Sequence, residues 1–109
     1  MAVIHKELAS GRWQQFTLCE QLANIGSEVS RAQKWFYKDQ KLYESAIERA
    51  LELFDLTLAD QRWKGRLREI ARVRELFCDT ITGGKEYKTS LEYLDRYFFY
   101  YALCARRNI

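Results

Sequence analysis

Apolar side chains recur at alternating steps of four and three residues in the first third of the chain. The repeating positions are Leu18, Leu22, Ile25, Val29, Ala32 and Phe36. An α-helix turns once in about 3.6 residues, so these side chains share one face, with the a/d spacing of helices that pack nearly parallel. The spacing therefore predicts a long amphipathic helix, which we place at residues 10–38.

A row of small residues follows the same predicted helix, beside the apolar face. It consists of Cys19, Ala23, Gly26 and Ser30. A glycine in a helix interior costs about 1 kcal/mol relative to alanine. We therefore expect a neighbouring helix to pack closely against Gly26.

Three further amphipathic segments predict helices at 40–58, 60–82 and 89–107. The chain contains no proline and only 5 glycines, so few residues interrupt helices and the connections should be short. We predict an all-α protein, a single up-and-down four-helix bundle spanning residues 1–109, in which residues 1–9 are a mobile N-terminus.

The ends of these helices carry recognisable signals. Asp60 is a predicted N-cap, because its carboxylate can accept the free amides of the following turn. Gly83 and Gly84 are typical of a helix end, and Thr89 with Glu92 has the spacing of a capping box.

Five adjacent aromatic side chains, Tyr97 to Tyr101, lie in the last predicted helix and cannot all face one core. Phe98 and Tyr101 fall on the core side, whereas Phe99 and Leu103 fall among charged residues. Scattered apolar residues are common on protein surfaces, which is one explanation. The neighbouring tyrosines widen the patch and favour a contact surface, formed by Tyr93, Tyr97, Phe99, Tyr100 and Leu103.

The third predicted helix is rich in cations, although the net charge of the chain is only +3. Acidic residues interrupt its basic rows, which favours a solvated face with ion pairs. The alternative is contact with nucleic acid, for which the candidate residues are Arg62, Arg66, Arg68 and Arg72.

Arg74 falls within the apolar stripe of the third predicted helix. A buried guanidinium needs a partner, so we predict a buried ion pair or an anion site, with Glu28 as the preferred carboxylate and Asp55 as the next. An arginine that extends into solvent at the end of the bundle is a further alternative.

The three cysteines, Cys19, Cys78 and Cys104, show no metal-binding or disulfide spacing. We expect reduced thiols and a cytoplasmic protein, since neither a signal peptide nor a membrane span is indicated.

No catalytic signature is present, so we predict a non-enzymatic protein without a cofactor. The only histidine, His5, precedes the predicted helices and leaves no general base on them. A row of acidic residues could bind a hard cation, but its position outside the apolar face favours solvation, and no metal site is predicted at Glu44, Glu48 and Glu52.

The segments "ANIGSEVSRAQKW" and "AIERALELFDL" resemble the small four-helix bundles of the HEPN and nucleotidyltransferase-partner class. The arginine and histidine of the HEPN nuclease motif are absent, so the resemblance does not imply nuclease activity. The stretch "YESAIERALEL" also resembles half of a tetratricopeptide repeat, without a second copy. Small ribosomal-insert bundles are a weaker likeness, which would imply a symmetric oligomer that contacts RNA.

From the sequence we expect a helical-bundle protein that acts through protein contacts, as a homo-oligomer or as a partner subunit. The alternative function is an RNA- or nucleotide-interacting accessory protein that uses the basic third helix.

Overall fold

The computed structural model describes residues 12–83 and 91–107, with side chains up to Cys104. This part of the chain is helical and contains no strand. Its elements are η1 (Arg12–Gln15), α2 (Leu18–Trp35), α3 (Gln40–Leu58), η2 (Gln61–Arg66), α4 (Leu67–Ile81) and α5 (Leu91–Arg107). The prediction of an all-α four-helix bundle is confirmed.

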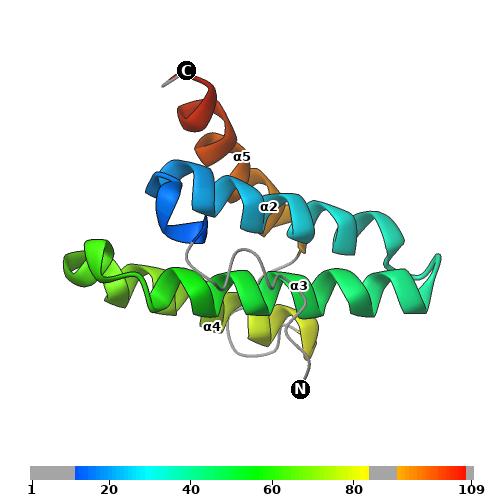
Figure 1. The fold of residues 1–109 in the computed structure, drawn as a ribbon. Coiled ribbons are helices and arrows are strands. Elements are labelled where there is room, and N and C mark those ends of the chain that lie inside the picture. The colour runs from blue at the N-terminus through cyan, green and yellow to red at the C-terminus, as the bar shows by residue number, and fades with distance from the viewer. Residues whose placement is uncertain (1–11, 84–90, 108–109) are drawn as a thin grey trace.

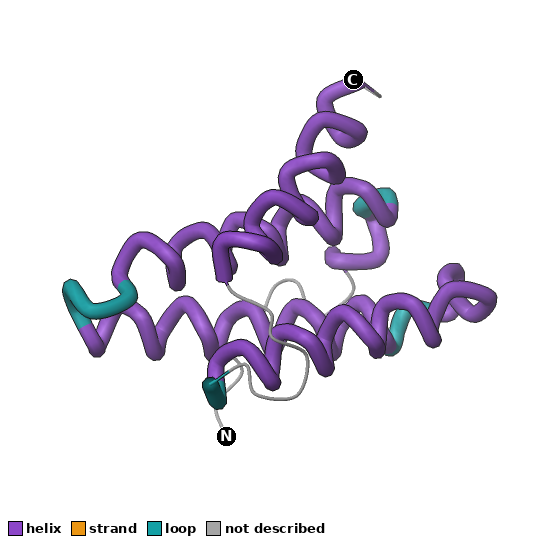
Figure 2. Tube along the Cα trace, turned by 180° about the vertical axis from the view of Figure 1, so that it is seen from behind, coloured by secondary structure: helices purple, strands orange, loops and turns teal. Residues whose placement is uncertain are grey.

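Helix α2 is the centre of the packing, because it contacts both α3 and α5 extensively. In Figure 1, α2 lies above α3, and α4 runs beside α3. Figure 2 shows from behind that α5 crosses α2 and that its C-terminal end extends beyond the other helices. One face of α5 is therefore left without a neighbouring helix in the described fold.

Two of the predicted helices are divided in the structure. Thr17 caps α2: its hydroxyl accepts the Glu20 amide at 3.2 Å, and the Glu20 carboxylate accepts the Thr17 amide at 2.8 Å. This capping box ends the 3-10 turn η1 and begins α2, so the predicted helix 10–38 starts too early. Non-helical torsion angles at Trp63 likewise separate η2 from α4.

Large aromatic rings from three helices form the centre of the core. Phe54 of α3 lies 5.8 Å from Phe77 of α4 and 6.1 Å from Phe98 of α5, measured between ring centroids. All three rings are almost fully buried. Aromatic pairs at these separations contribute beyond their buried area, which holds α5 against the layer of α3 and α4.

A buried polar network joins the start of α2 to the end of α3. The side-chain amide of Gln21 donates to the Trp13 carbonyl at 2.9 Å and to Asp60 Oδ2 at 3.0 Å. Gln21 Oε1 accepts the Trp63 indole N–H at 2.8 Å, and the Trp13 indole donates to Thr57 at 3.1 Å. Each buried polar group thus has a partner, which is the condition for tolerating such a network in a core.

Asp60 anchors the outer end of this network. Its carboxylate accepts the Arg62 amide at 3.0 Å, which confirms the predicted N-cap, and it also binds the Arg62 guanidinium at 2.7 Å. The hydrogen bond from the Arg62 side chain lowers the pKa of Asp60 to about 2, against an opposing effect of burial.

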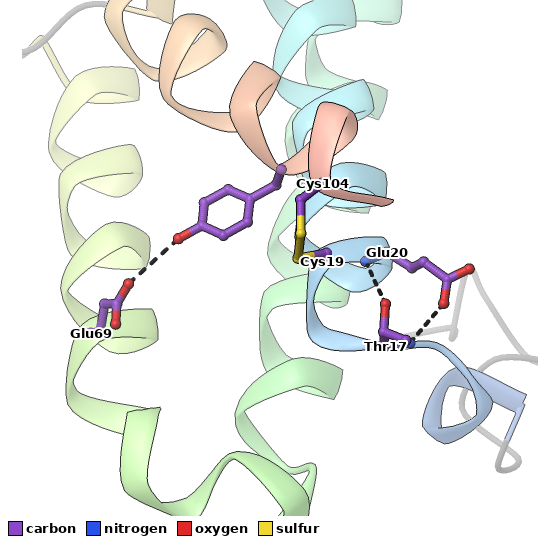
Figure 3. The surroundings of a disulfide bond; sticks show 6 residues. Thr17, Cys19, Glu20, Glu69 and Cys104 are labelled. Carbon is purple, nitrogen blue, oxygen red and sulfur yellow. Dashed lines mark hydrogen bonds between the residues drawn. A yellow bond between two sulfur atoms is a disulfide. The ribbon is translucent and has the colours of Figure 1, made fainter. Parts of the chain in front are cut away.

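A disulfide joins Cys19 at the start of α2 to Cys104 near the end of α5 (Figure 3). The two Cα atoms are 6.0 Å apart, a normal separation for a disulfide. The prediction of three reduced thiols is therefore wrong for this pair, and only Cys78 is a free thiol among the described cysteines. Because disulfides persist in oxidising compartments, the cysteines no longer support the expected cytoplasmic location.

Several sequence predictions fall outside the described residues. They concern His5 and the mobile N-terminus 1–9, the helix-ending role of Gly84, and the capping box that begins at Thr89. Gly83 is described and has a φ of 118°, which supports its predicted role as a helix end. Within the described ranges, every helix is too short or too polar to cross a membrane.

Candidate functional site

The side of α5 that points away from the core carries large exposed hydrophobic side chains. Tyr93, Phe99, Tyr100 and Leu103 are 57%, 58%, 72% and 38% exposed, and Arg96 lies exposed among them. We call these five residues the α5 face. The opposite side of the helix carries the core residues Leu91, Leu94 and Phe98, so large hydrophobic side chains lie on both sides of α5 and only one side is buried.

Three of the exposed apolar side chains of the α5 face lie close together in the sequence of the helix. Phe99 and Tyr100 are adjacent, with ring centroids 6.3 Å apart, and Leu103 follows one helical turn later. A continuous apolar patch on a water-exposed helix costs free energy, since burying apolar surface is favourable. Such patches with charged neighbours mark contact surfaces.

Tyr97 differs from the other residues of the predicted contact surface, because it is less exposed and makes contacts within the fold. It is half-buried, and its hydroxyl lies 3.2 Å from that of Tyr101. The Tyr101 hydroxyl in turn donates to Glu69 of α4 at 3.5 Å. Burial is the main cause of the raised pKa of Tyr97, and the hydrogen bond to Tyr101 raises it further. Tyr97 therefore packs inside the fold, between α5 and α4.

A groove of about 490 Å³ runs beside the α5 face, between α2 and α5. On the α2 side its wall consists of small residues, among them Ala23, Ser27 and Ser30. On the α5 side it is lined by Asp95, Arg96, Phe98, Phe99 and Ala102. The small residues of α2 leave space next to Phe99 that a larger side chain would fill.

A second exposed aromatic group, which sequence reasoning missed, surrounds the turn between α2 and α3. Phe36, expected in the core, is the C-cap of α2 and 42% exposed. Its ring centroid lies 4.0 Å from that of Tyr37 and 5.4 Å from that of Tyr43. Tyr37 is 93% exposed and has a positive φ of 65°. The sequence signal that could have indicated this group is the run of three aromatic residues, Trp35–Tyr37, at the end of the predicted helix.

The structure separates Arg74 from Glu28, the carboxylate preferred as its partner, so that prediction is wrong. Arg74 Nε pairs instead with Asp55 Oδ1 at 3.1 Å, the second candidate. The Arg74 side chain is 33% exposed and that of Asp55 is 62% exposed, so this is a surface ion pair between α4 and α3. Because the Arg74 guanidinium is paired with Asp55 and partly solvated, its charge can be accommodated without a bound anion.

Glu28 is buried on α2 and pairs with the exposed Arg31 one turn later, at 2.8 Å. Only one of its carboxylate oxygens is used. Oε2 is buried and has no hydrogen-bond partner among the described residues. A buried carboxylate oxygen without a partner lowers the contribution of its side chain to stability, which makes Glu28 a site for mutational testing.

The basic residues proposed for nucleic-acid contact do not form one basic face. Arg62 is bound to Asp60 and stacks over the Trp63 ring at 4.4 Å, and Arg66 pairs with Glu69 at 3.1 Å. These hydrogen bonds raise the pKa of both arginines. Arg68 and Arg72 are exposed on α4. Two of the four candidates are thus engaged within the protein.

The acidic row of α3 does not converge on one point. Glu44 accepts a hydrogen bond from Gln40 at 3.0 Å, and Glu48 is exposed. Across the described residues, no group of three or more histidine, cysteine, aspartate or glutamate side chains is placed to hold a metal ion.

Comparison of the chain with protein-family models, with curated proteins and with solved structures found no match. The resemblance to the HEPN class therefore stays a prediction.

Proposed function

We propose that this protein acts through contact with another polypeptide chain, and that the α5 face is the contact surface. The observation that carries the proposal is the exposure of Tyr93, Phe99, Tyr100 and Leu103 on one side of a helix whose other side is core. Residues of this type dominate the binding energy of protein interfaces, because they bury a large area at a low cost in side-chain entropy.

The proposal assigns no catalytic residue to the chain. The grooves beside α5 and beside the turn between α2 and α3 are open, and their linings combine aromatic with small or polar side chains. The Ser27 and Thr80 hydroxyls in these linings donate to the Ala23 and Leu76 carbonyls, at 3.2 Å and 2.7 Å, and not to a side-chain base that would activate them as nucleophiles. A role in binding is therefore better supported than a role in catalysis.

Site-specific photo-crosslinking in cells that express the protein tests this proposal. A benzoylphenylalanine in place of Tyr100 should form a covalent adduct with a protein chain, because this ring would lie inside the interface. The same group in place of Arg49, exposed on α3, serves as the control and should form none.

Introducing Phe99→Glu next to the photo-reactive group should remove the adduct, since a buried unpaired carboxylate opposes association. Adducts of equal yield from positions 100 and 49, or none from position 100, would contradict the proposal.

A further inference from the structure

The charge pattern of the α5 face indicates which chain covers it. We propose that the occupant is α5 of a second copy of this protein, packed antiparallel across a two-fold axis. This inference rests on the proposed function and names its partner.

Arg96 is the charged residue in the middle of the face, between Tyr93 on one side and Phe99 and Tyr100 on the other. In a parallel pair of α5 helices, each residue would face its own copy, so that Arg96 would meet Arg96 and Glu92 would meet Glu92. Like charges placed opposite one another oppose association. A parallel arrangement is therefore disfavoured by the sequence of the face itself.

An antiparallel pair removes both repulsions. When residue 96 lies opposite residue 100, each Arg96 guanidinium lies over the Tyr100 ring of the other copy. Arginine is attracted to the face of an aromatic ring. The same alignment places Tyr93 opposite Leu103, which pairs two apolar side chains at each end. Because the axis repeats every contact, the face is complementary to itself without any further residue.

The groove between α2 and α5 supports the same occupant. A helix laid on the α5 face lies next to Phe99, where Ala23, Ser27 and Ser30 of α2 leave about 490 Å³ unfilled. Side chains on the flank of the second helix can enter this space, since small residues allow close approach. The second copy supplies such a side chain in its own Phe99.

Mass measurement in solution is the first test. Sedimentation equilibrium of the full chain at tens of micromolar should give the mass of two chains. Phe99→Glu should weaken the dimer at least roughly 100-fold, as expected when a charge replaces an aromatic residue that is buried at an interface. Tyr37→Glu is the matched control, because it places the same charge on another exposed aromatic position, and it should leave the dimer unchanged.

Cysteine crosslinking tests the direction of the helices, in a Cys78→Ser background that retains the native disulfide. A mixture of Arg96→Cys and Tyr100→Cys chains, oxidised with glutathione disulfide, should form covalent heterodimers. Opposite residues in the antiparallel pair can reach the Cα separation of a disulfide, about 4.4–6.8 Å. Arg96→Cys alone should not crosslink, since its two copies are offset by about 6 Å along the helix axis.

The outcomes separate this inference from the proposed function. Single-chain mass for the wild type, or efficient crosslinking of Arg96→Cys with itself, overturns the antiparallel dimer. If the wild type has single-chain mass and position 100 still forms an adduct with a different protein, the contact surface stands and the second copy is wrong. If Phe99→Glu is unfolded by circular dichroism, the crosslinking pair decides alone, because neither Arg96 nor Tyr100 is part of the core.

Discussion

Gly26 of α2 and Phe98 of α5 are in direct contact: a Cβ atom at position 26 would lie 2.5 Å from the Phe98 Cβ atom. Real Cβ atoms do not approach so closely, so the absence of a side chain at Gly26 sets the distance between the two helices. The close packing expected at Gly26 from the sequence is confirmed.

We therefore predict that Gly26→Ala lowers the free energy of unfolding by roughly 1–3 kcal/mol, because overpacking outweighs the gain in helix propensity. Urea denaturation measures the change. Gly65→Ala is the matched control, since a Cβ atom at Gly65 meets nothing within 4 Å. A Gly26→Ala variant as stable as the wild type would show that α5 can move away from α2 without cost.

Reduction of the Cys19–Cys104 disulfide should destabilise the protein strongly. The bond closes a sequence separation of 85 residues, for which the chain-entropy estimate is roughly 4.5 kcal/mol. Dithiothreitol should lower the midpoint of thermal unfolding of the wild type. The variant with both Cys19→Ser and Cys104→Ser should start at the lower midpoint and no longer respond to dithiothreitol.

The control for this experiment is Cys78→Ser, which removes the free thiol and leaves the disulfide intact. It should retain the full response to reductant. Equal midpoints with and without dithiothreitol in the wild type would mean that the disulfide contributes nothing to stability.

Asp60 should make stability depend on acid pH. Its pKa falls from an ordinary value of 3.8 to about 2 in the fold, chiefly through the Arg62 side chain. A carboxylate with a lowered folded pKa stabilises above its unfolded pKa, and this contribution is lost as the pH falls from 3.8 through about 2. The loss amounts to about 2 kcal/mol.

Urea unfolding at several pH values between neutral pH and about pH 2 measures this dependence. Asp60→Asn cannot titrate, so its stability should fall less steeply over the same range. Parallel curves for the wild type and Asp60→Asn would assign the acid sensitivity to other carboxylates.

Glu28→Leu should leave the free energy of unfolding unchanged or raise it by up to roughly 2 kcal/mol. The substitution removes a buried oxygen that has no partner among the described atoms, and Arg31 remains solvated. Glu20→Leu on the same helix is the contrasting variant, because it breaks the capping box and should cost about 1 kcal/mol. Chemical denaturation of both variants gives the comparison, and a large loss for Glu28→Leu would indicate a partner for Oε2.

Binding to single-stranded RNA should be weak and should disappear near physiological salt. Arg62 and Arg66 are held by Asp60 and Glu69, which leaves Arg68 and Arg72 as the exposed cations of the proposed set. Few phosphate contacts give low affinity that salt readily screens. Fluorescence anisotropy with a labelled oligonucleotide checks this, and tight binding at physiological salt would favour the RNA-interacting alternative.

The fold class follows from periodicity, which depends on local sequence. The predicted helix 40–58 coincides with α3, because its apolar face and the N-cap Asp39 both lie within the segment. The same reasoning placed the start of the first helix too early, although the capping-box spacing Thr17 to Glu20 is present in the sequence. The sequence around Trp63 carries no such signal for the kink, and the hydrogen bond from its indole goes to Gln21, which is distant in the sequence.

The contact surface was only partly predictable. Phe99 and Leu103 could be assigned to the exposed side because a helical wheel fixes their direction relative to the core. Tyr97 and Arg74 could not, since their positions depend on which helix lies beside them, and single-sequence periodicity does not give helix order. The pairing of Cys19 with Cys104 was not predictable for the same reason, because it requires that the start of α2 lie beside the end of α5.

The disulfide also determines how the protein would respond to mechanical force. A force applied to the two chain ends is transmitted along the backbone to Cys19 and Cys104, and then through the covalent bond between them. The 85-residue separation, which would otherwise extend to about 300 Å, stays shielded from tension while the bond is intact. Helices α3 and α4 would therefore remain folded under forces that unravel the chain outside the bond, and a reductant would make this hidden length available.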